Sequence, residues 1–358
     1  YRFRDRYLII TEPAMPVSPT KLCAMWREVL TLSKLTAGES VLVLTSANSN
    51  PQLIDAATRA SMELGATVLR MDIPPAWDDH ESGTDPTTVT GKSPIDNNAM
   101  ALAAMKEADL IIDLVFLLFT PGQREVLRSG SRMLLVYDAP EVLARVMPSL
   151  DDRRRVIAAR DTYLEGKEIH ITSAAGTDLR AQIGKYPITA EYGFVDEPGR
   201  WDHWPSGFVA RQTNDRTAEG TVVLMPGDII LPFKSYIQSP IKLTIKEGYI
   251  KSIEGGFDAE FMRQYVEDFN QPDAFAVAHL GRALQPKARW SALGLTDKHP
   301  TIAMEARAFA GNFLFSTGPG GERQTHCHLD IPMRHCSFSI DGVPMTTKGQ
   351  DVPEAQRA

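Results

Sequence analysis

Short apolar runs alternate with helical patterns in the first part of the chain, from about residue 21 to residue 147. Strands are predicted at the apolar runs 41–44, 67–71, 110–118 and 133–137, and helices at 51–65, at 95–108 and from about residue 140. Continuous apolar strands separated by helices indicate a parallel sheet with both faces covered. We therefore predict that residues 1–160 form an α/β domain with a largely parallel sheet.

The pattern changes past about residue 160, where strands and turns dominate. Predicted strands lie at 168–183, 220–231, 242–253, 274–280, 312–316 and 325–340, with one helix at 259–269. This order suits an α+β domain built on largely antiparallel sheet. We assign residues 161–358 to this second domain and predict that it carries the functional site. The tail after Thr346 is expected to be disordered.

The turn after the first predicted strand, residues 45–50, contains no glycine. The glycine-rich phosphate loop that often follows the first strand of a parallel sheet is therefore missing, and no nucleotide is inferred. Ser49 or Asn50 is expected instead to cap the helix that begins at Pro51.

Composition and charge limit the possible partners. The net charge of −7 argues against a nucleic-acid or anionic-membrane surface, because both need a concentrated basic patch. The most apolar window, 110–119, is about half as long as a membrane span. Three cysteines and a start, residues 1–5, without an apolar signal core favour a reduced, cytoplasmic protein. We expect a small-molecule or protein partner.

The segment from Thr325 to Asp330 places two imidazoles and a carboxylate at alternate positions. In an extended strand, His326, His328 and Asp330 would project from one face. A His-x-Asp pair joined by one more histidine makes a ligand set that leaves positions free on Fe(II) for substrate and oxygen. The segment therefore predicts a metal site.

His279 is the candidate for the further histidine. It follows the apolar run 275–278 and precedes Leu280 and Gly281, where a glycine permits close approach of the backbone. A polar residue that closes a buried strand is a common way to place a ligand on a rigid element. If His279 is considered alone, a hydrogen-bonded imidazole that binds no metal remains the alternative. Together with the His-x-Asp pair, metal binding by His279 is favoured.

Four short segments carry a family likeness: Gly176-Thr177-Asp178-Leu179, Pro205-Ser206-Gly207, Ala278-His279-Leu280-Gly281 and Cys327-His328-Leu329-Asp330. In order and spacing they resemble the family of metallo-aminopeptidases from thermophiles and its ring-cleaving relatives, over nearly the whole chain. The resemblance to the ring-cleaving branch implies an Fe(II) enzyme with one iron per chain, held by His279, His328 and Asp330, and makes a homo-oligomer plausible.

The departures from the peptidase pattern decide between the branches. That pattern has a glutamate where this chain has His279, and it supplies another histidine where residues 311–318 contain none. A second metal would lack its ligands. The ring-cleaving branch implies extradiol-type opening of 2,5-dihydroxypyridine, or a close hydroxylated N-heterocycle, with O2 to give N-formylmaleamate, as in nicotinate breakdown. A dinuclear metallo-aminopeptidase and an inactive ligand-binding relative remain alternatives.

Two further residues are candidates for proton transfer and ring binding. His203 lies in an aromatic, proline-containing loop, and an imidazole of ordinary pKa serves both as base and as acid. A purely local hydrogen bond to Asp202 is the alternative. Glu191, at the end of a probable strand, is a candidate for binding the ring nitrogen or a hydroxyl, with an ordinary surface glutamate as the alternative.

Four residues complete the predicted substrate site. Leu118 and Phe119 close the longest apolar run and are candidates for an apolar lid over a flat ring, although a core role explains them equally well. Ser206 belongs to the loop of His203. His326 is expected to support the metal ligands by hydrogen bonding rather than to bind the metal.

Overall fold

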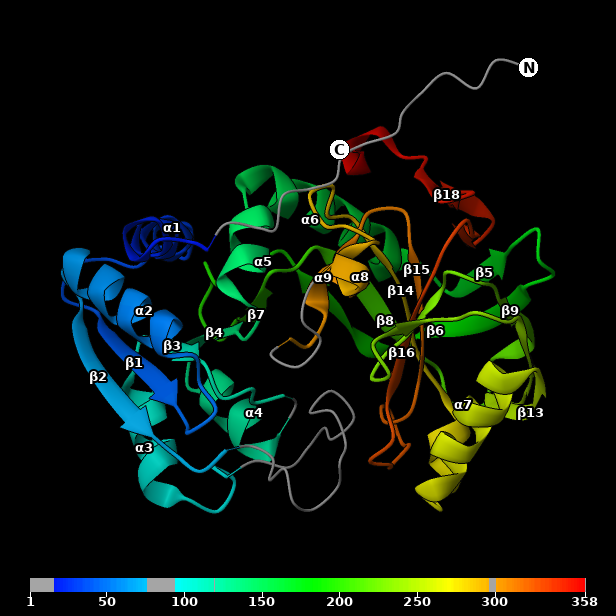
Figure 1. Ribbon diagram of the computed structural model, residues 1–358, viewed down its shortest axis with the longest axis horizontal. Helices are drawn as coiled ribbons and strands as arrows, with labels where there is room; N and C mark the ends of the chain where they lie inside the picture. Colours follow the sequence, from blue (N-terminus) through cyan, green and yellow to red (C-terminus); the bar gives the residue numbers. More distant parts are fainter. Residues whose placement is uncertain (1–15, 76–93, 119, 296–300, 358) are drawn as a thin grey trace.

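The structure is a computed structural model that describes residues 16–75, 94–118, 120–295 and 301–357. Two halves lie side by side, an N-terminal half of helices around a sheet and a C-terminal half dominated by strands (Figure 1). The sheet of the first half is parallel and the large sheet of the second is antiparallel, so the predicted fold class is confirmed.

The parallel sheet has the strand order β2-β1-β3-β4-β7. Its strands are β1 (Ser40–Thr45), β2 (Thr67–Asp72), β3 (Leu110–Asp113), β4 (Arg132–Val136) and β7 (Trp201–Trp204). The helices of this half are α1 (Pro19–Leu32), α2 (Pro51–Glu63), α3 (Ala99–Glu107), α4 (Pro121–Arg128), α5 (Pro140–Arg145) and α6 (Leu150–Glu165). The proposed division at residue 160 remains a prediction. Strand β7 lies beyond it and still completes the parallel sheet.

The start of α2 follows from local side-chain chemistry. The Asn50 side chain accepts a hydrogen bond from the Gln52 N–H, and Pro51 occupies the first turn. Asn50 is therefore the cap, whereas the Ser49 hydroxyl donates to the Leu114 carbonyl oxygen at 2.7 Å.

Strand β3 is shorter than the predicted strand at 110–118. The buried Asp113 carboxylate accepts hydrogen bonds from the N–H groups of Val115, Phe116 and Leu117 at 2.8, 3.0 and 2.7 Å. These N–H groups are therefore not available for pairing with a neighbouring strand, and Phe116 adopts a positive φ of 75°. The chain consequently turns after Asp113, and the loop carries Phe116 and Leu118 toward the antiparallel half.

The antiparallel sheet runs β16-β15-β14-β8-β6-β5-β17-β18-β19, with β9, β12 and β13 attached beside β6. Its strands are β5 (Glu168–Thr172), β6 (Asp178–Glu191), β8 (Phe208–Thr213), β9 (Glu219–Leu224), β12 (Ile241–Lys246), β13 (Tyr249–Gly255), β14 (Val277–Ala283), β15 (Phe313–Thr317), β16 (Leu329–Met333), β17 (Ser337–Ile340), β18 (Val343–Thr347) and β19 (Gln350–Asp351). A small ribbon joins β10 (Ile229–Ile230) to β11 (Ser235–Tyr236). Helices are α7 (Phe257–Asp268), α8 (Ala292–Leu295), α9 (Met304–Ala308) and the 3-10 turns η2 (Pro272–Phe275) and η3 (Glu354–Gln356).

The expectation of a disordered tail after Thr346 is wrong. The tail forms the end of β18, then β19 and η3, and it is anchored on β14 by the buried Arg282. The Arg282 guanidinium donates to the Met345 carbonyl oxygen at 2.7 Å and to the Gln356 side chain. A buried guanidinium needs such acceptors, so it ties the tail to the sheet.

The two halves share one hydrophobic core, in which Trp26 of α1 meets Trp204 of β7 edge to face with ring centroids 5.3 Å apart. Among the helices within the described residues, none combines the length and apolar character that crossing a membrane requires.

Candidate metal centre and substrate cavity

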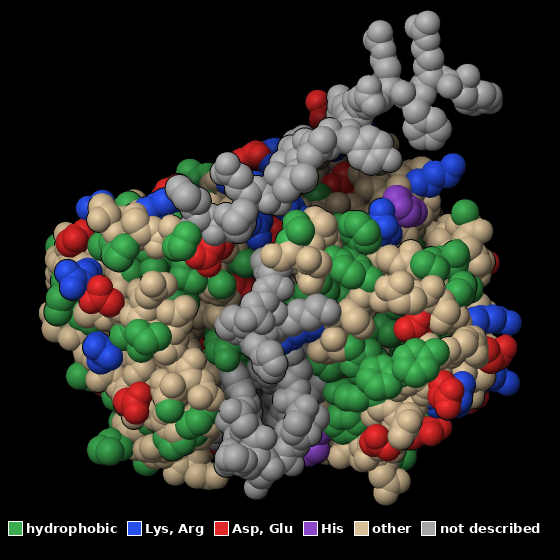
Figure 2. Space-filling view, in the orientation of Figure 1, with side chains coloured by type: hydrophobic (Ala, Val, Ile, Leu, Met, Phe, Trp, Pro, Cys, Tyr) green, Lys and Arg blue, Asp and Glu red, His purple; other side chains and the backbone are tan. Residues whose placement is uncertain are grey.

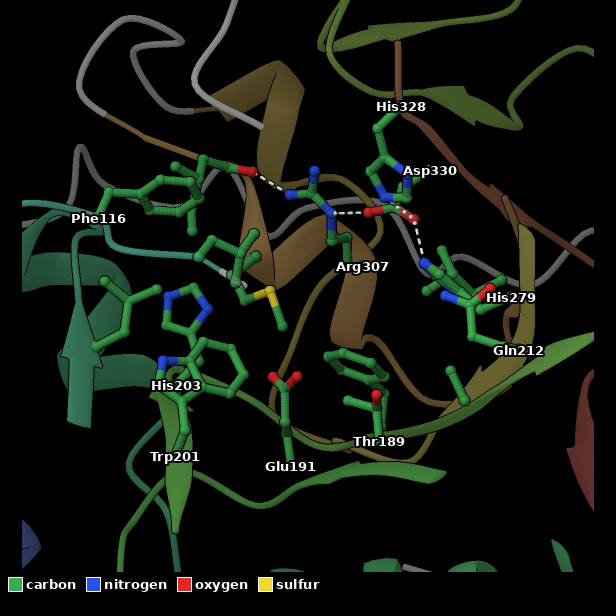
Figure 3. A pocket seen from close by; sticks show the side chains of 17 residues that line it. Phe116, Thr189, Glu191, Trp201, His203, Gln212, His279, Arg307, His328 and Asp330 are labelled. Atoms are coloured by element: carbon green, nitrogen blue, oxygen red, sulfur yellow. Dashed lines mark hydrogen bonds and ion pairs between the residues drawn. The ribbon is translucent and has the colours of Figure 1, made fainter. Parts of the chain in front are cut away.

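A cavity lies where the parallel sheet meets the antiparallel sheet (Figure 3). It encloses about 680 Å³ of space not filled by protein atoms, part of it open to solvent. The parallel half contributes the loop after β3, β4 and β7. The antiparallel half contributes β6, β8, β14, β15 and β16, with α9 and the residues before it. Neither half forms the cavity alone. Figure 2 shows one face of the molecule in the orientation of Figure 1.

Three side chains converge at one wall of this cavity. His279 comes from β14, His328 directly precedes β16, and Asp330 lies on β16. Nε2 of each histidine is 3.3 Å from Asp330 Oδ1, and one nitrogen or oxygen from each residue lies within 4.8 Å of the others. The structure therefore brings together the three residues that the sequence singled out as metal ligands.

The donor set fits a single metal ion. Ligand atoms about 2.1 Å from a common ion and at right angles lie about 3 Å apart, close to the observed separations. Asp330 Oδ1 is buried without a hydrogen-bond partner in the described parts of the chain, as a ligand atom awaiting a metal would be. Two imidazoles and one carboxylate on one side of an ion are the donor set of mononuclear Fe(II) oxygenases.

A β-bulge orients His279. In the pairing of β14 with β15, Ala278 and His279 together oppose the single residue Ser316. The Ser316 hydroxyl accepts from the His279 N–H at 2.8 Å and donates to the His279 carbonyl oxygen at 2.9 Å. The hydroxyl thus replaces the backbone partners that His279 loses at the bulge.

A buried arginine stands behind the carboxylate. Arg307 Nε donates to Asp330 Oδ2 at 2.8 Å, and its guanidinium also donates to the Ile302 carbonyl oxygen. Burial alone would raise the pKa of Asp330, but the charges of His328 and Arg307 hold this pKa well below its usual range. Burial lowers the pKa of His279, against the opposing effect of Asp330. An ionised carboxylate and a neutral imidazole are the forms that bind metals.

Glu191 and His203 line the cavity together with the metal-ligand candidates (Figure 3). Burial and the nearby Asp202 charge raise the pKa of Glu191 well above its usual range, which favours the protonated form of its carboxyl group. Ser206 Oγ lies 3.2 Å from Glu191 Oε2. Burial and the Arg307 charge lower the pKa of His203 to about 3, and its Nε2 has no hydrogen-bond partner in the described chain. His203 is therefore a neutral imidazole, which departs from the near-neutral pKa expected for a proton-transfer group.

The remaining predicted site residues are placed differently. Leu118 lines the cavity, whereas Ser206 reaches it through Glu191. Phe119 lies outside the described residues. His326 is exposed, and its backbone N–H donates to Gln271 Oε1 at 2.8 Å. Because β16 begins only at Leu329 and the chain bends at His326, the expected alternation across 326–330 is wrong and His326 does not line the cavity.

Sequence reasoning missed several cavity residues, above all Arg307, Thr189 and Gln212. Thr189 was recoverable, since it alternates with Glu191 on β6 and so shares its face. No pattern in the sequence distinguishes Arg307 from a surface arginine, because its burial arises from the packing of α9 against β14 and β16.

Two histidines and one carboxylate, brought together from β14 and the start of β16 beside a cavity, are typical of a mononuclear metal enzyme of the oxygenase class. The family described as 2,5-dihydroxypyridine 5,6-dioxygenase matches residues 21–353. The chain belongs to this family of enzymes.

Known relatives are similar to nearly the whole of this chain. The chain is 46% identical over 349 residues to the 2,5-dihydroxypyridine 5,6-dioxygenase of Pseudomonas putida, covering 96% of this chain and 100% of the relative. It is similar to a solved structure of 2,5-dihydroxypyridine dioxygenase from Pseudomonas putida KT2440, with a TM-score of 0.93, 45% identity and coverage of 96% and 100%. Wild-type AmpT from Thermus thermophilus shares the fold, with a TM-score of 0.55, 13% identity and coverage of 93% and 99%.

Proposed function

We propose that this chain is a non-haem Fe(II) dioxygenase that opens the ring of 2,5-dihydroxypyridine with O2 to give N-formylmaleamate. One iron per chain would be held by His279, His328 and Asp330. The observation that carries the proposal is the convergence of these three side chains at one wall of the cavity. The name of the relative with 46% identity supports the substrate.

The bound Fe(II) would supply open coordination positions for a ring oxygen and for O2, and electron density that lets O2 react with a closed-shell ring. Both atoms of O2 enter the product when the bond between C5 and C6 breaks. The reaction therefore needs no external reductant.

Charge at the site favours an anionic ring. Asp330 offsets one of the two charges of Fe(II), but Arg307 adds a positive charge at its other oxygen. The raised pKa of Glu191 disfavours a negative charge on its carboxyl group, and His203, with a pKa of about 3, carries no charge at pH 7. A ring that has lost its hydroxyl proton is stabilised here, because opposite charges attract strongly in a buried site.

The protonated form of Glu191, which burial favours, suits the nitrogen side of the ring. In its pyridone form, the ring presents an N–H and a C=O next to each other. A protonated carboxyl group offers one donor and one acceptor in matching order. We assign Glu191 to this edge, where it would orient the ring against the apolar side chains of Phe116, Leu118 and Met304.

His203 is assigned to the ring hydroxyl. Its Nε2 has no partner in the described chain and accepts the hydroxyl proton in the tautomer that carries its own proton on Nδ1. An imidazole with a pKa of about 3 is a weak base, but an anionic ring oxygen beside it favours the charged form and raises this pKa. His203 would thus take the proton as the ring becomes anionic and return it during ring opening.

The decisive experiment is anaerobic reconstitution with Fe(II), followed by O2 uptake with a panel of dihydroxypyridines and catechols. We expect about one iron per chain, uptake with 2,5-dihydroxypyridine, and loss of iron retention in His279→Ala and His328→Ala. Two zinc or cobalt ions with release of an N-terminal amino acid would indicate the aminopeptidase instead. Within the described residues, only one group of His, Cys, Asp and Glu side chains is close enough to hold a metal, which favours the mononuclear enzyme.

An inactive ligand-binding relative is the other alternative. It would bind the ring equally well in the wild-type chain and in His279→Ala, with no dependence on metal. A metal requirement for ring binding or turnover contradicts that alternative.

A further inference from the structure

Asp202 lies directly behind both polar groups that we assign to the ring. Its side chain is fully buried and does not line the cavity. Asp202 Oδ1 accepts the His203 N–H at 2.7 Å and the Gly193 N–H at 2.9 Å. Its Oδ2 accepts the Tyr192 N–H at 3.0 Å. One carboxylate therefore holds the backbone of His203 and that of the residue directly after Glu191.

These contacts join the two halves of the molecule. Glu191 ends β6 of the antiparallel sheet, whereas His203 lies on β7 of the parallel sheet. The turn between them brings its N–H groups to Asp202 with the help of Gly193, whose φ of 98° favours glycine. The distance between Glu191 and His203 thus depends on a carboxylate that touches neither side chain.

Arg200 completes this arrangement. Its guanidinium pairs with Asp202 Oδ2, donates to the Ala190 carbonyl oxygen at 2.7 Å and lies over the Tyr192 ring at 3.7 Å from the centroid. A buried carboxylate with several backbone donors and one cation is held in a single geometry. The Asp202 carboxylate has all these hydrogen-bond partners without any ligand, as a preorganised support for a binding site requires.

We infer that Asp202 is a positioning residue for the ring site, fixing Glu191 and His203 at one spacing across the junction of the two sheets. The inference rests on the proposed function, because the ring is the ligand that Glu191 and His203 hold. The metal ligands come from other strands, so Asp202 sets ring binding and leaves metal binding alone.

The test is a double-mutant cycle on the dissociation constant of 2,5-dihydroxypyridine, measured anaerobically with the Fe(II)-loaded full chain. In Asp202→Asn, an NH2 group replaces one carboxylate oxygen and faces N–H donors, from which it cannot accept hydrogen bonds. We expect it to weaken ring binding about 10- to 100-fold, because small misplacements of positioning groups have effects of this order. Iron content should stay at the wild-type value. In the Glu191→Gln/His203→Ala background, the same change should weaken binding less than about 3-fold, because Asp202 acts through these residues.

Asp196→Asn is the matched control, since Asp196 is a buried carboxylate of the same turn that contacts the Tyr192 hydroxyl and Arg153 but neither assigned residue. It should leave the dissociation constant within about 3-fold of wild type. If Asp202→Asn does not fold, Arg200→Gln keeps the backbone contacts of Asp202 and should show the same non-additivity with a smaller amplitude.

Equal weakening in both backgrounds, or unchanged ring binding in the single variant, would overturn the inference. Failure of the wild-type Fe(II)-loaded chain to bind 2,5-dihydroxypyridine would instead overturn the proposed function, so the two failures are distinguishable.

Discussion

The Ser316 hydroxyl bonds both the N–H and the carbonyl oxygen of His279, at 2.8 and 2.9 Å. Ser316 also lies opposite Asp330 in the pairing of β15 with β16. One fully buried residue therefore stands between the strands that carry two of the three metal-ligand candidates. It supports the bulge that turns His279 toward Asp330.

Replacing Ser316 with alanine should weaken metal binding. Without the hydroxyl, the His279 N–H and carbonyl group lose their partners at the bulge, and the imidazole is no longer held toward Asp330. Loss of a group that orients a metal ligand typically reduces metal affinity about 10- to 100-fold. Competition with a chelator of known affinity measures this change.

Thr317→Val is the matched control for Ser316→Ala. Thr317 is the next residue on β15, its hydroxyl is buried, and no partner for it exists among the described residues. Its loss should leave metal affinity unchanged. Equal affinities of the Ser316→Ala and wild-type chains would show that the bulge holds His279 without the hydroxyl.

Arg307→Met should weaken binding of the anionic ring, measured on the chain loaded with Fe(II). The variant removes the positive charge next to Asp330, and charged hydrogen bonds of this kind contribute about 1.5 to 3 kcal/mol. We expect KM for 2,5-dihydroxypyridine to rise at least about 10-fold. Arg307→Lys, which keeps the charge but not the paired geometry, should recover part of the loss. A KM equal to that of wild type in Arg307→Met would contradict the charge argument.

His203→Ala should lower kcat more than it changes KM. A positioned proton acceptor typically contributes about 10²- to 10⁴-fold to the rate. Iron content should stay the same, because His203 belongs to β7 and not to the ligand strands. Steady-state O2 uptake across pH tests this prediction. An unchanged turnover rate and pH profile would remove His203 from the mechanism.

Asp138 should make the folded chain less stable as pH rises. Its carboxyl group is fully buried, accepts the Thr301 hydroxyl and leaves Oδ2 unpartnered in the described chain. Burial raises its pKa from 3.8 to about 6. A folded pKa above the unfolded one means that the folded state binds more protons between these values. The contribution of Asp138 to stability is therefore fully present below about pH 4 and is lost as pH rises through about 6.

Asp138→Asn tests the sign of this effect. The shift corresponds to about 3 kcal/mol. The variant should gain up to this free energy of unfolding relative to wild type between pH 4 and pH 7.5, measured from urea unfolding at both pH values. A stability difference that is independent of pH would show that Asp138 is ionised equally in the folded and unfolded chains.

Much of the fold could be predicted because its signals are local. The apolar run at 41–44 and the Asn50-Pro51 cap define β1 and the start of α2 without help from distant residues. The strand predicted at 110–118 was wrong beyond Asp113 because one buried carboxylate captures the next three free N–H groups. The pattern of apolar residues does not show that a buried carboxylate will accept these N–H groups.

The candidate site was predictable to the extent that its residues are chemically distinctive. His279, His328 and Asp330 stand out by residue type and spacing, and the structure brings them together. His326 shares the same spacing signal, yet the strand begins after it. Arg307 and the assembly of β7 into the parallel sheet depend on tertiary packing, so no local pattern reveals them.

The buried Arg282 connects the C-terminal end of the chain to the strand that carries His279, although the described C-terminal residues do not line the cavity. Arg282 lies three residues after His279 on β14, and its acceptors come from the last fourteen residues of the chain. Removing those residues would leave the buried Arg282 guanidinium without its acceptors. Arg282 lies on β14, the same strand that presents the His279 imidazole to the cavity. Shortened versions designed for crystallisation or immobilisation would thus risk losing the metal from a cut made at the periphery.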